Sequence, residues 1–443
     1  MPRTTQIFCA STLYGAATLA AAIEADRFRE PDRRILLVFN NASVPETSTP
    51  VHEMPGFGAL RKHFDEVLCF NDAIGPLHPA AWSPRQDDIP LLERYFRMLW
   101  RLGDDRLELV LESLQVNPAL AFASIFTGAP IHAYADGLMS YGPTRNKIDP
   151  LVGTRVRRLL HLDLVPGLKP VLLSEFGVEP EIVPAENFLK VMGALTGASG
   201  EVPAVPDGAA LLLGQYLSAL DILTPAEETR LHLRMMRGAV ERGHRSLVFK
   251  PHPMAPADYE LALEAEAERL GVDLTVIDQP VLAEVLFARA RPALVVGCFS
   301  TALFTASAFY GLPVARIGTG TLLDRLAPFQ NSNRVPVVLA DALLPDLEAE
   351  TPADPLPPKQ LEGLVTAVSF AMQPQVLSAR RPAAERFLSQ HFDARVQRYF
   401  KKRRLTALGL PGGIPQRLAF LPRNSTARRV ARRARRTWRS VKG

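Results

Sequence analysis

Two rhythms of apolar and polar positions alternate along the chain. Short runs rich in β-branched and other apolar residues recur, separated by longer stretches with apolar residues at helical spacing. Several short runs are almost wholly apolar, which is typical of parallel strands covered on both faces. In the first half, the predicted strands are Thr5–Ala10, Arg34–Phe39, Glu66–Phe70, Leu107–Leu111, Pro130–Tyr134 and Pro170–Ser174.

Helical patterns fill the gaps between these strands. Helices are predicted over Ala16–Ala25, Leu91–Leu102 and Pro118–Phe126. A strand–helix–strand rhythm of this kind predicts a doubly wound α/β domain.

A second series of strands and helices follows a break in the pattern. The segment Ala198–Gly208 is rich in Gly, Pro and small residues and predicts a linker. Beyond it, Ala257–Leu270 predicts a helix that Gly271 stops, and Pro382–Phe400 predicts a last helix. The predicted strands of this series are Ala210–Leu213, Ser246–Lys250, Leu274–Ile277, Ala293–Val296 and Val314–Ile317.

The chain has 443 residues, more than one hydrophobic core normally serves, so two domains are expected. We predict an α/β fold in which two Rossmann-like, doubly wound domains face a cleft. The predicted bounds are 1–200 for the first domain, 208–375 for the second, 376–400 for a closing helix and 401–443 for a basic tail.

Composition excludes several classes of protein. Hydrophobic residues make up 47% and charged residues 22%, which indicates a globular rather than a disordered chain. No apolar run approaches the roughly 20 residues of a membrane-spanning helix. The mostly apolar stretch Ile7–Ile23 after Arg3 resembles a secretion signal, but polar residues interrupt it, so a strand, a turn and a helix are favoured.

Cysteine and histidine usage favours a reducing compartment and no structural metal. Cys9, Cys69 and Cys298 are widely separated and each lies in an apolar run, as expected for buried, reduced thiols in a cytosolic protein. The nine histidines show no paired metal-ligand spacing, so neither a zinc site nor another cofactor is expected.

The net charge of +5 hides an asymmetry. Residues 401–443 contain fourteen Lys or Arg and no Asp or Glu, so the rest of the chain is net acidic. From Ser425 to Val441, apolar residues recur at helical spacing among arginines, a pattern suited to an anionic membrane surface. A disordered, solvated tail and a nucleic-acid-binding tail are the alternatives, and the acidic body argues against the latter. An acceptor built on a membrane lipid would explain the tail.

The first cluster with candidate chemistry follows the predicted strand Pro130–Tyr134. Ligands of open α/β sheets bind beyond the carboxyl ends of the strands. Asp136 lies there, and Gly137 lets the backbone turn closely beside it. A carboxylate in this place could accept a proton from an acceptor hydroxyl. An ordinary Asp-Gly turn is the structural alternative.

Two further clusters lie in the second half. Lys250 ends a strand, and prolines, including Pro253, flank His252, whose imidazole can donate a proton at cellular pH. Ser300 and Thr301 open a helix, where hydroxyls and free N–H groups can hold a phosphate. A rigid strand-to-helix connection and a plain N-cap are the structural alternatives. The combination predicts acceptor activation on one side of a cleft and donor phosphate binding on the other.

The order of the three clusters is similar to that in bacterial sialyltransferases of GT-B architecture, especially the polysialyltransferase-like family. Those proteins share an acidic-Asp-Gly motif, a His-Pro motif and a Ser/Thr pair. The corresponding residues here are Ala135-Asp136-Gly137, His252-Pro253 and Ser300-Thr301, and the resemblance spans about residues 1–400. Ala135 departs from the family because many relatives have a second acidic residue there, and Thr301 replaces a second Ser.

The resemblance implies a metal-independent, inverting transfer of sialic acid from a CMP-linked donor to a glycan hydroxyl. Asp136 would be the general base, and His252 would assist departure of CMP. Glu284 has a spacing similar to that of a family Glu that binds the donor ribose. The residues expected to contact the donor are Gly137, Lys250, Pro253, Glu284, Ser300 and Thr301.

Three other functions compete with this hypothesis. Enzymes that use CMP-Kdo or CDP-polyol donors in surface polysaccharide synthesis also show His-Pro and Ser-containing motifs. A nucleic-acid-binding protein and a degenerate transferase fold that acts only as a scaffold are the others. The intact Asp136, His252 and Ser300 argue against the scaffold. We expect a cytoplasmic enzyme that binds the inner face of the plasma membrane peripherally.

Overall fold

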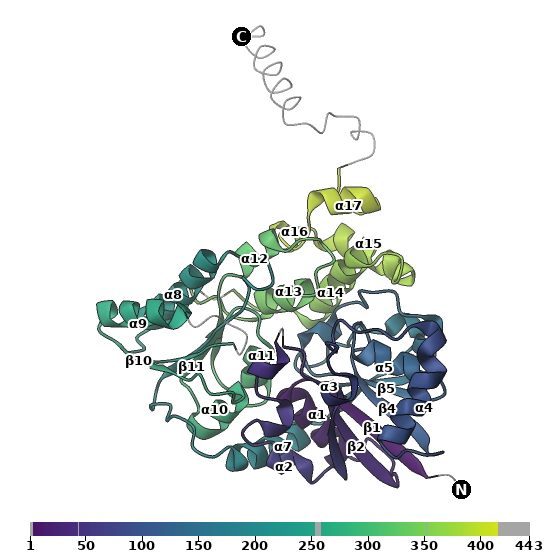
Figure 1. Cartoon of the computed structure of the whole chain (residues 1–443). Coiled ribbons are helices and arrows are strands. Elements are labelled where there is room, and N and C mark those ends of the chain that lie inside the picture. The colour runs from purple at the N-terminus through teal and green to yellow at the C-terminus, as the bar shows by residue number, and fades with distance from the viewer. Residues whose placement is uncertain (1–2, 43, 253–257, 352, 415–443) are drawn as a thin grey trace, which may run out of the picture.

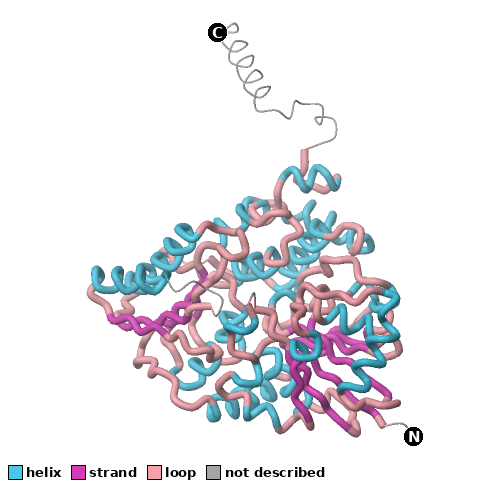
Figure 2. Tube along the Cα trace, in the orientation of Figure 1, coloured by secondary structure: helices cyan, strands magenta, loops and turns pink. Residues whose placement is uncertain are grey.

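The computed structural model describes residues 3–42, 44–252, 258–351 and 353–414, and it contains two separate parallel sheets (Figures 1 and 2). The first sheet has seven strands in the order β3-β2-β1-β4-β5-β6-β7, and the second has five in the order β10-β9-β8-β11-β12. In each sheet the chain starts at the centre, builds outward to one edge, and then returns to build the other side. This order confirms the predicted α/β class with two doubly wound halves.

The strands are β1 (Thr4–Ala10), β2 (Arg33–Val38), β3 (Glu66–Cys69), β4 (Arg106–Glu112), β5 (Ile131–Ala135), β6 (Val156–Leu162), β7 (Pro180–Val183), β8 (Ala210–Leu213), β9 (Ser246–Lys250), β10 (Asp273–Val276), β11 (Leu294–Gly297) and β12 (Val314–Arg316).

The helices are α1 (Leu13–Glu24), α2 (Gly58–Arg61), α3 (Phe70–Ile74), α4 (Ile89–Leu99), α5 (Ala119–Ile125), α6 (Pro150–Gly153), α7 (Ala185–Ala198), α8 (Pro225–Glu241), α9 (Asp258–Leu270), α10 (Ala283–Ala290), α11 (Thr301–Ala308), α12 (Thr319–Arg325), α13 (Arg334–Leu343), α14 (Pro358–Met372), α15 (Arg381–His391), α16 (Ala394–Gln397) and α17 (Lys402–Leu408).

Alternate residues of the first sheet enter two different cores, as the two-residue period of a strand requires. Ile7 and Cys9 of β1 belong to the core beneath α4 and α5. Phe8 and Ala10 face the opposite way, towards α1 and α7, and that core continues without a break into the second half of the chain. Figure 1 shows α4 and α5 on one side of the first sheet and α1, α2 and α7 on the other. The two halves therefore share one of their hydrophobic cores.

The segment after the second sheet packs against both halves. Gln373 follows α14, and its side-chain amide donates a 2.7 Å hydrogen bond to the carbonyl of Arg145 in the first half. Arg404 of α17 donates to the carbonyl of Ala371 at 2.7 Å, and Leu405 is fully buried. The folded body thus includes α17, which lies inside the segment predicted as a tail. The predicted domain bounds themselves stay a prediction, and residues 425–441 lie outside the described residues.

Two predicted elements are wrong, and two strands of the structure were not predicted. Residues 170–174 form no strand, because the N–H groups of Val171 and Leu172 bond to Ser140 and Leu173 adopts a left-handed φ of 62°. Strands β6 and β7 were not predicted, because polar side chains interrupt the apolar run of β6 and β7 is a four-residue edge strand. The predicted helix Pro382–Phe400 is broken, because the Asp393 carboxylate accepts from the N–H of Val396 at 2.9 Å and caps a new helix.

A buried carboxylate ties the C-terminal helices to the second sheet. The fully buried side chain of Asp341 on α13 accepts a 2.9 Å hydrogen bond from the hydroxyl of Tyr399 and one of 2.5 Å from Thr319. It also lies 3.3 Å from the guanidinium of Arg316, which ends β12. Asp341 therefore links three segments that are distant in the sequence.

We predict that Asp341→Ala lowers the free energy of unfolding by about 3–5 kcal/mol, because the buried hydroxyls of Tyr399 and Thr319 lose their acceptor and the buried Arg316 guanidinium keeps only Asp346 as a carboxylate partner. Urea denaturation measures this loss. Asp324→Ala is the matched control, since Asp324 is 84% exposed and pairs with Lys401 at the surface at 2.9 Å. That change should cost no more than about 1 kcal/mol. Equal losses in the two variants would contradict the structural role of Asp341.

Candidate active site

Polar side chains gather at the carboxyl ends of three adjacent strands of the first sheet. Ser11 and Thr12 follow β1, Glu112 ends β4, and Asp136 follows β5. The hydroxyl of Ser11 donates a 2.6 Å hydrogen bond to Glu112, and the hydroxyl of Thr12 lies 3.4 Å from an Asp136 carboxylate oxygen. The order β1-β4-β5 thus places two carboxylates beside each other at the central switch point of the sheet.

Burial raises the pKa of both carboxyl groups. Burial raises the pKa of Asp136 to about 7, and the charge of Glu112 contributes to that rise, while hydrogen bonds from its own backbone and from Thr12 oppose it. Burial also raises the pKa of Glu112, against the hydrogen bond from Ser11. A carboxylate with a pKa near 7 is a far better proton acceptor than an ordinary Asp.

The start of helix α1 approaches Asp136 closely. The Thr12 hydroxyl caps the helix by accepting from the N–H of Gly15 at 2.9 Å. A Cβ atom on Gly15 would lie 3.2 Å from a carboxylate oxygen of Asp136 and 3.1 Å from the hydroxyl of Tyr134. Glycine therefore permits the contact, and the positive end of the helix dipole lies beside the carboxylate.

The second sheet brings the other predicted residues to its own carboxyl edge. Lys250 ends β9, His252 follows it, and Ser300 follows β11, so these groups flank the central strand β8. Gly214 follows β8, and a Cβ atom there would lie 3.2 Å from the backbone nitrogen of His252. The Ser300 hydroxyl accepts from the N–H of Ala302 at 3.2 Å, so Ser300 is the N-cap of α11.

The pKa values of His252 and Lys250 are both lower than those of exposed side chains of the same type. The imidazole of His252 stacks on Tyr216 with ring centroids 3.9 Å apart, and burial together with the charge of Lys250 lowers its pKa to about 4. Burial lowers the pKa of Lys250 to about 8, and its ammonium group donates to the carbonyl of Gln279 at 2.9 Å. Without a bound anion, His252 is therefore neutral at pH 7 and Lys250 is mostly charged.

The two clusters meet where the halves of the molecule touch. A Cβ atom on Gly137 would lie 3.0 Å from the hydroxyl oxygen of Thr301, so the Asp-Gly turn lies against the start of α11. The hydroxyl groups of Tyr14 and Thr305 form a 3.1 Å hydrogen bond across the same contact. The structure thus brings the turn that carries Asp136 against the Ser/Thr pair.

Another predicted donor residue, Glu284, lies next to this contact. Glu284 lies in the first turn of α10, is only 3% exposed and interacts with the buried hydroxyl of Thr305, and burial raises its pKa to about 7. Its carboxyl group thus contacts α11 through Thr305, and ribose binding stays a prediction. Pro253 lies outside the described residues.

Sequence reasoning missed Thr12, Tyr14 and Glu112. A usable signal for the first two was the hydroxyl-rich turn that directly follows the first strand of a βαβ unit. Glu112 places a second carboxylate beside Asp136, whereas the residue that precedes Asp136 in the chain is Ala135. The side chain of Ala135 is buried in the core beneath α4 and α5, on the sheet face away from α1, so an acidic residue there would enter that core.

The described residues offer neither a candidate metal site nor a candidate membrane span. They contain no group of three or more His, Cys, Asp or Glu side chains arranged to hold a metal ion. None of their helices combines the length and the apolarity needed to cross a bilayer.

The family follows from the comparison with known proteins. A family model described as alpha-2,8-polysialyltransferase (POLYST) matches residues 6–319, well over half of the chain. The chain belongs to the alpha-2,8-polysialyltransferase family. The predicted resemblance is therefore confirmed, and with it a glycosyltransferase whose two Rossmann-ordered sheets form the GT-B architecture. No curated protein gives a sequence match.

The chain is similar to several solved structures, but its sequence identity to them is low. The *Photobacterium damsela* sialyltransferase is 12% identical, with a TM-score of 0.42, over 76% of this chain and 78% of that one. MurG of *Acinetobacter baumannii* is 12% identical, with a TM-score of 0.39, over 88% and 95% of the two chains. The *E. coli* heptosyltransferase WaaC is 14% identical, with a TM-score of 0.37, over 71% and 88%.

We predict that Asp136→Asn raises the melting temperature at pH 8. The folded-state pKa of Asp136 is about 7, above its value of about 3.9 in an unfolded chain. Its ionisation therefore destabilises the fold increasingly from about pH 4 to about pH 7, and Asn removes that penalty. Thermal unfolding at pH 8 and at about pH 4 should show stabilisation only at pH 8. Asp87→Asn, at an exposed position, is the control and should leave the melting temperature unchanged at both pH values. A lower melting temperature of Asp136→Asn at pH 8 would contradict the raised pKa of Asp136.

Proposed function

We propose that this transferase moves sialic acid from CMP-sialic acid to a glycan hydroxyl, with inversion and without a metal ion. The observation that carries the proposal is the contact of the Asp136-Gly137 turn with Thr301 at the start of α11. A proton acceptor and an anion-binding helix start, contributed by different halves, lie against each other. Membership of the alpha-2,8-polysialyltransferase family supports the sugar that is transferred.

Asp136 is the general base in this proposal. Its carboxylate accepts the proton of the acceptor hydroxyl while the hydroxyl oxygen attacks the anomeric carbon, which develops oxocarbenium character. Burial, together with the charge of Glu112, raises the pKa of Asp136 to about 7, so the base is partly ionised and strongly proton-accepting at cellular pH. Attack from the side opposite the leaving CMP inverts the anomeric configuration.

The start of α11 holds the phosphate of the leaving CMP. The hydroxyls of Ser300 and Thr301 and the free N–H groups of the first turn donate hydrogen bonds to it, assisted by the helix dipole. His252 is neutral before the donor binds and gains a proton as the phosphate raises its pKa. Lys250 adds positive charge, and these groups together serve the role that a metal ion has in other transferases. The further donor contacts proposed are Gly137, Pro253 and Glu284.

We propose further that the enzyme works at the cytoplasmic face of the membrane on a lipid-linked glycan. The support is the sequence of residues 425–441, which interleaves arginines with small apolar residues and Trp438. This arrangement keeps a charged, water-soluble donor and a membrane-bound acceptor on the same side of the bilayer.

The donor assignment predicts that CMP and CMP-sialic acid raise the melting temperature in the presence of a chelator. The gain in stability should be about 2.7 kcal/mol when the ligand is about 100-fold above its Kd. Thr301→Val should reduce this stabilisation, because one phosphate ligand is lost, whereas Thr229→Val on α8 should not. Stabilisation by UDP or GDP but not by CMP would refute the donor, and stabilisation by CMP without turnover of CMP-sialic acid would favour a CMP-Kdo or CDP-polyol donor.

The base assignment predicts a shift in the pH profile of kcat/KM. Activity should rise with pH through about 7 as Asp136 ionises, and Asp136→Ala should lower transfer by about 10²–10⁴-fold while CMP still binds. Glu112→Gln removes the neighbouring charge that raises the pKa of Asp136, so the acidic limb should move to lower pH. Glu108→Gln, on the same strand but bonded to Gln6, is the control. An unchanged limb in Glu112→Gln would contradict the role of the carboxylate pair.

A further inference from the structure

Helix α4 exposes an unusual number of large apolar side chains. Leu91 is 67% exposed, Met98 74%, Leu99 45% and Tyr95 38%. Their spacing places all four on one side of the helix, while Phe96 and Trp100 are buried on the other side. Exposed apolar groups gathered on one element mark a surface that contacts something less polar than water.

Arginines flank this apolar stripe. The guanidinium groups of Arg94 and Arg101 are exposed and form no ion pair with any residue that the structure describes. Arg97 is engaged differently, since it donates to Glu93 and to the carbonyl of Gly103. The stripe therefore has two unpaired cationic groups at its edge.

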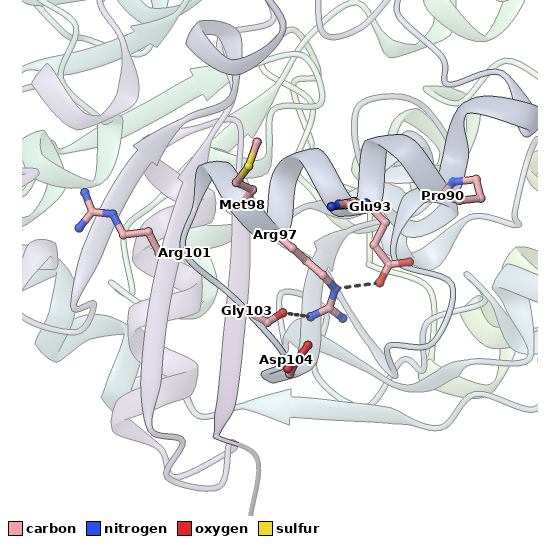
Figure 3. Close-up of a pocket in the computed structure, with 8 residues that line it drawn as sticks. Pro90, Glu93, Arg97, Met98, Arg101, Gly103 and Asp104 are labelled. Atoms are coloured by element: carbon pink, nitrogen blue, oxygen red, sulfur yellow. Dashed lines mark hydrogen bonds and ion pairs between the residues drawn. The ribbon is translucent and has the colours of Figure 1, made fainter.

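A shallow hollow of about 770 Å³ lies beside the stripe (Figure 3). In the close-up, Arg97 points towards Glu93 and Gly103, whereas Met98 and Arg101 extend away from them. Three arginines against Glu93 and Asp104 leave the lining with a net positive charge. A concave, cationic surface next to exposed Met and Leu side chains offers sites for both an anionic headgroup and acyl chains.

We propose that the outer face of α4, formed by Leu91, Arg94, Tyr95, Met98, Leu99 and Arg101, docks on an anionic phospholipid bilayer. The apolar stripe enters the boundary between headgroups and acyl chains, and the two arginines contact lipid phosphates. Tyr95 suits this depth because its ring is apolar and its hydroxyl, which donates to the carbonyl of Ala73, is polar. This contact is independent of residues 425–441 and of which sugar the enzyme transfers.

The composition of the face favours a bilayer over other partners. A polyanionic glycan would satisfy the arginines but leave Leu91 and Met98 in water. A second copy of the chain, joined by a two-fold axis through the centre of the stripe with the two α4 helices antiparallel, would bring Arg94 near Arg101 of the other copy. An anionic bilayer matches both parts of the face, because its phosphates suit the arginines and the acyl chains beneath them suit the apolar stripe.

A site-specific probe tests the contact in the full-length protein. Met98→Cys is labelled with a polarity-sensitive fluorophore in a Cys69→Ala background, since Cys69 is the one partly exposed native thiol of the chain. Phosphatidylcholine vesicles that contain phosphatidylglycerol should shift its emission to shorter wavelength, and pure phosphatidylcholine should not. The same label at Leu261→Cys, a 69% exposed position on α9, should not respond.

Charge variants provide a second measurement on the same vesicles. Arg94→Ala combined with Arg101→Ala should weaken binding by up to about 30-fold, because each arginine near an anionic surface contributes about 1 kcal/mol. Arg61→Ala combined with Arg386→Ala, which removes two exposed arginines elsewhere, is the control. Vesicle binding without any response of the label at position 98 would overturn the proposal, as would a response to free polysialic acid or to protein concentration in place of lipid.

Discussion

Helix α1 follows a strand of the first sheet and helix α11 follows a strand of the second, and the first turns of the two helices contact each other. The hydrogen bond between Tyr14 and Thr305, together with the close approach of Gly137 to Thr301, fixes that meeting. Because the two sheets share one hydrophobic core on this side, the contact is backed by apolar packing rather than by the hydrogen bond alone. The turn that carries Asp136 in one half and the start of α11 in the other are therefore held in a fixed relative position.

The surroundings of Asp136 also set its pKa. Burial raises that pKa to about 7, and the charge of Glu112, which ends the adjacent strand β4, adds to the rise. Ionisation of a buried carboxyl group lowers the stability of the fold, and the hydrogen bonds from Ser11 and Thr12 offset part of that loss. Carboxyl groups with such raised pKa values are typical of sites that perform acid–base chemistry.

Most strands could be predicted because parallel strands covered on both faces are continuous apolar runs. β8 and β9 were predicted to the residue for this reason. The pattern failed for β6, where arginines interrupt the apolar run, and for residues 170–174, whose apolar side chains pack as an irregular segment bonded to Ser140. In both cases long-range contacts outweigh the local pattern.

The sequence by itself determined the two α/β halves, the strand ends that carry Asp136, His252 and Ser300, and the family motifs, because these depend on local periodicity and short spacing. It could not determine the pairing of Glu112 with Asp136, since strand order is set by the packing of whole sheets and not by neighbouring residues. Burial and charge likewise come from many distant segments, so only the tertiary structure decided that Asp136 titrates near 7 and that His252 is neutral.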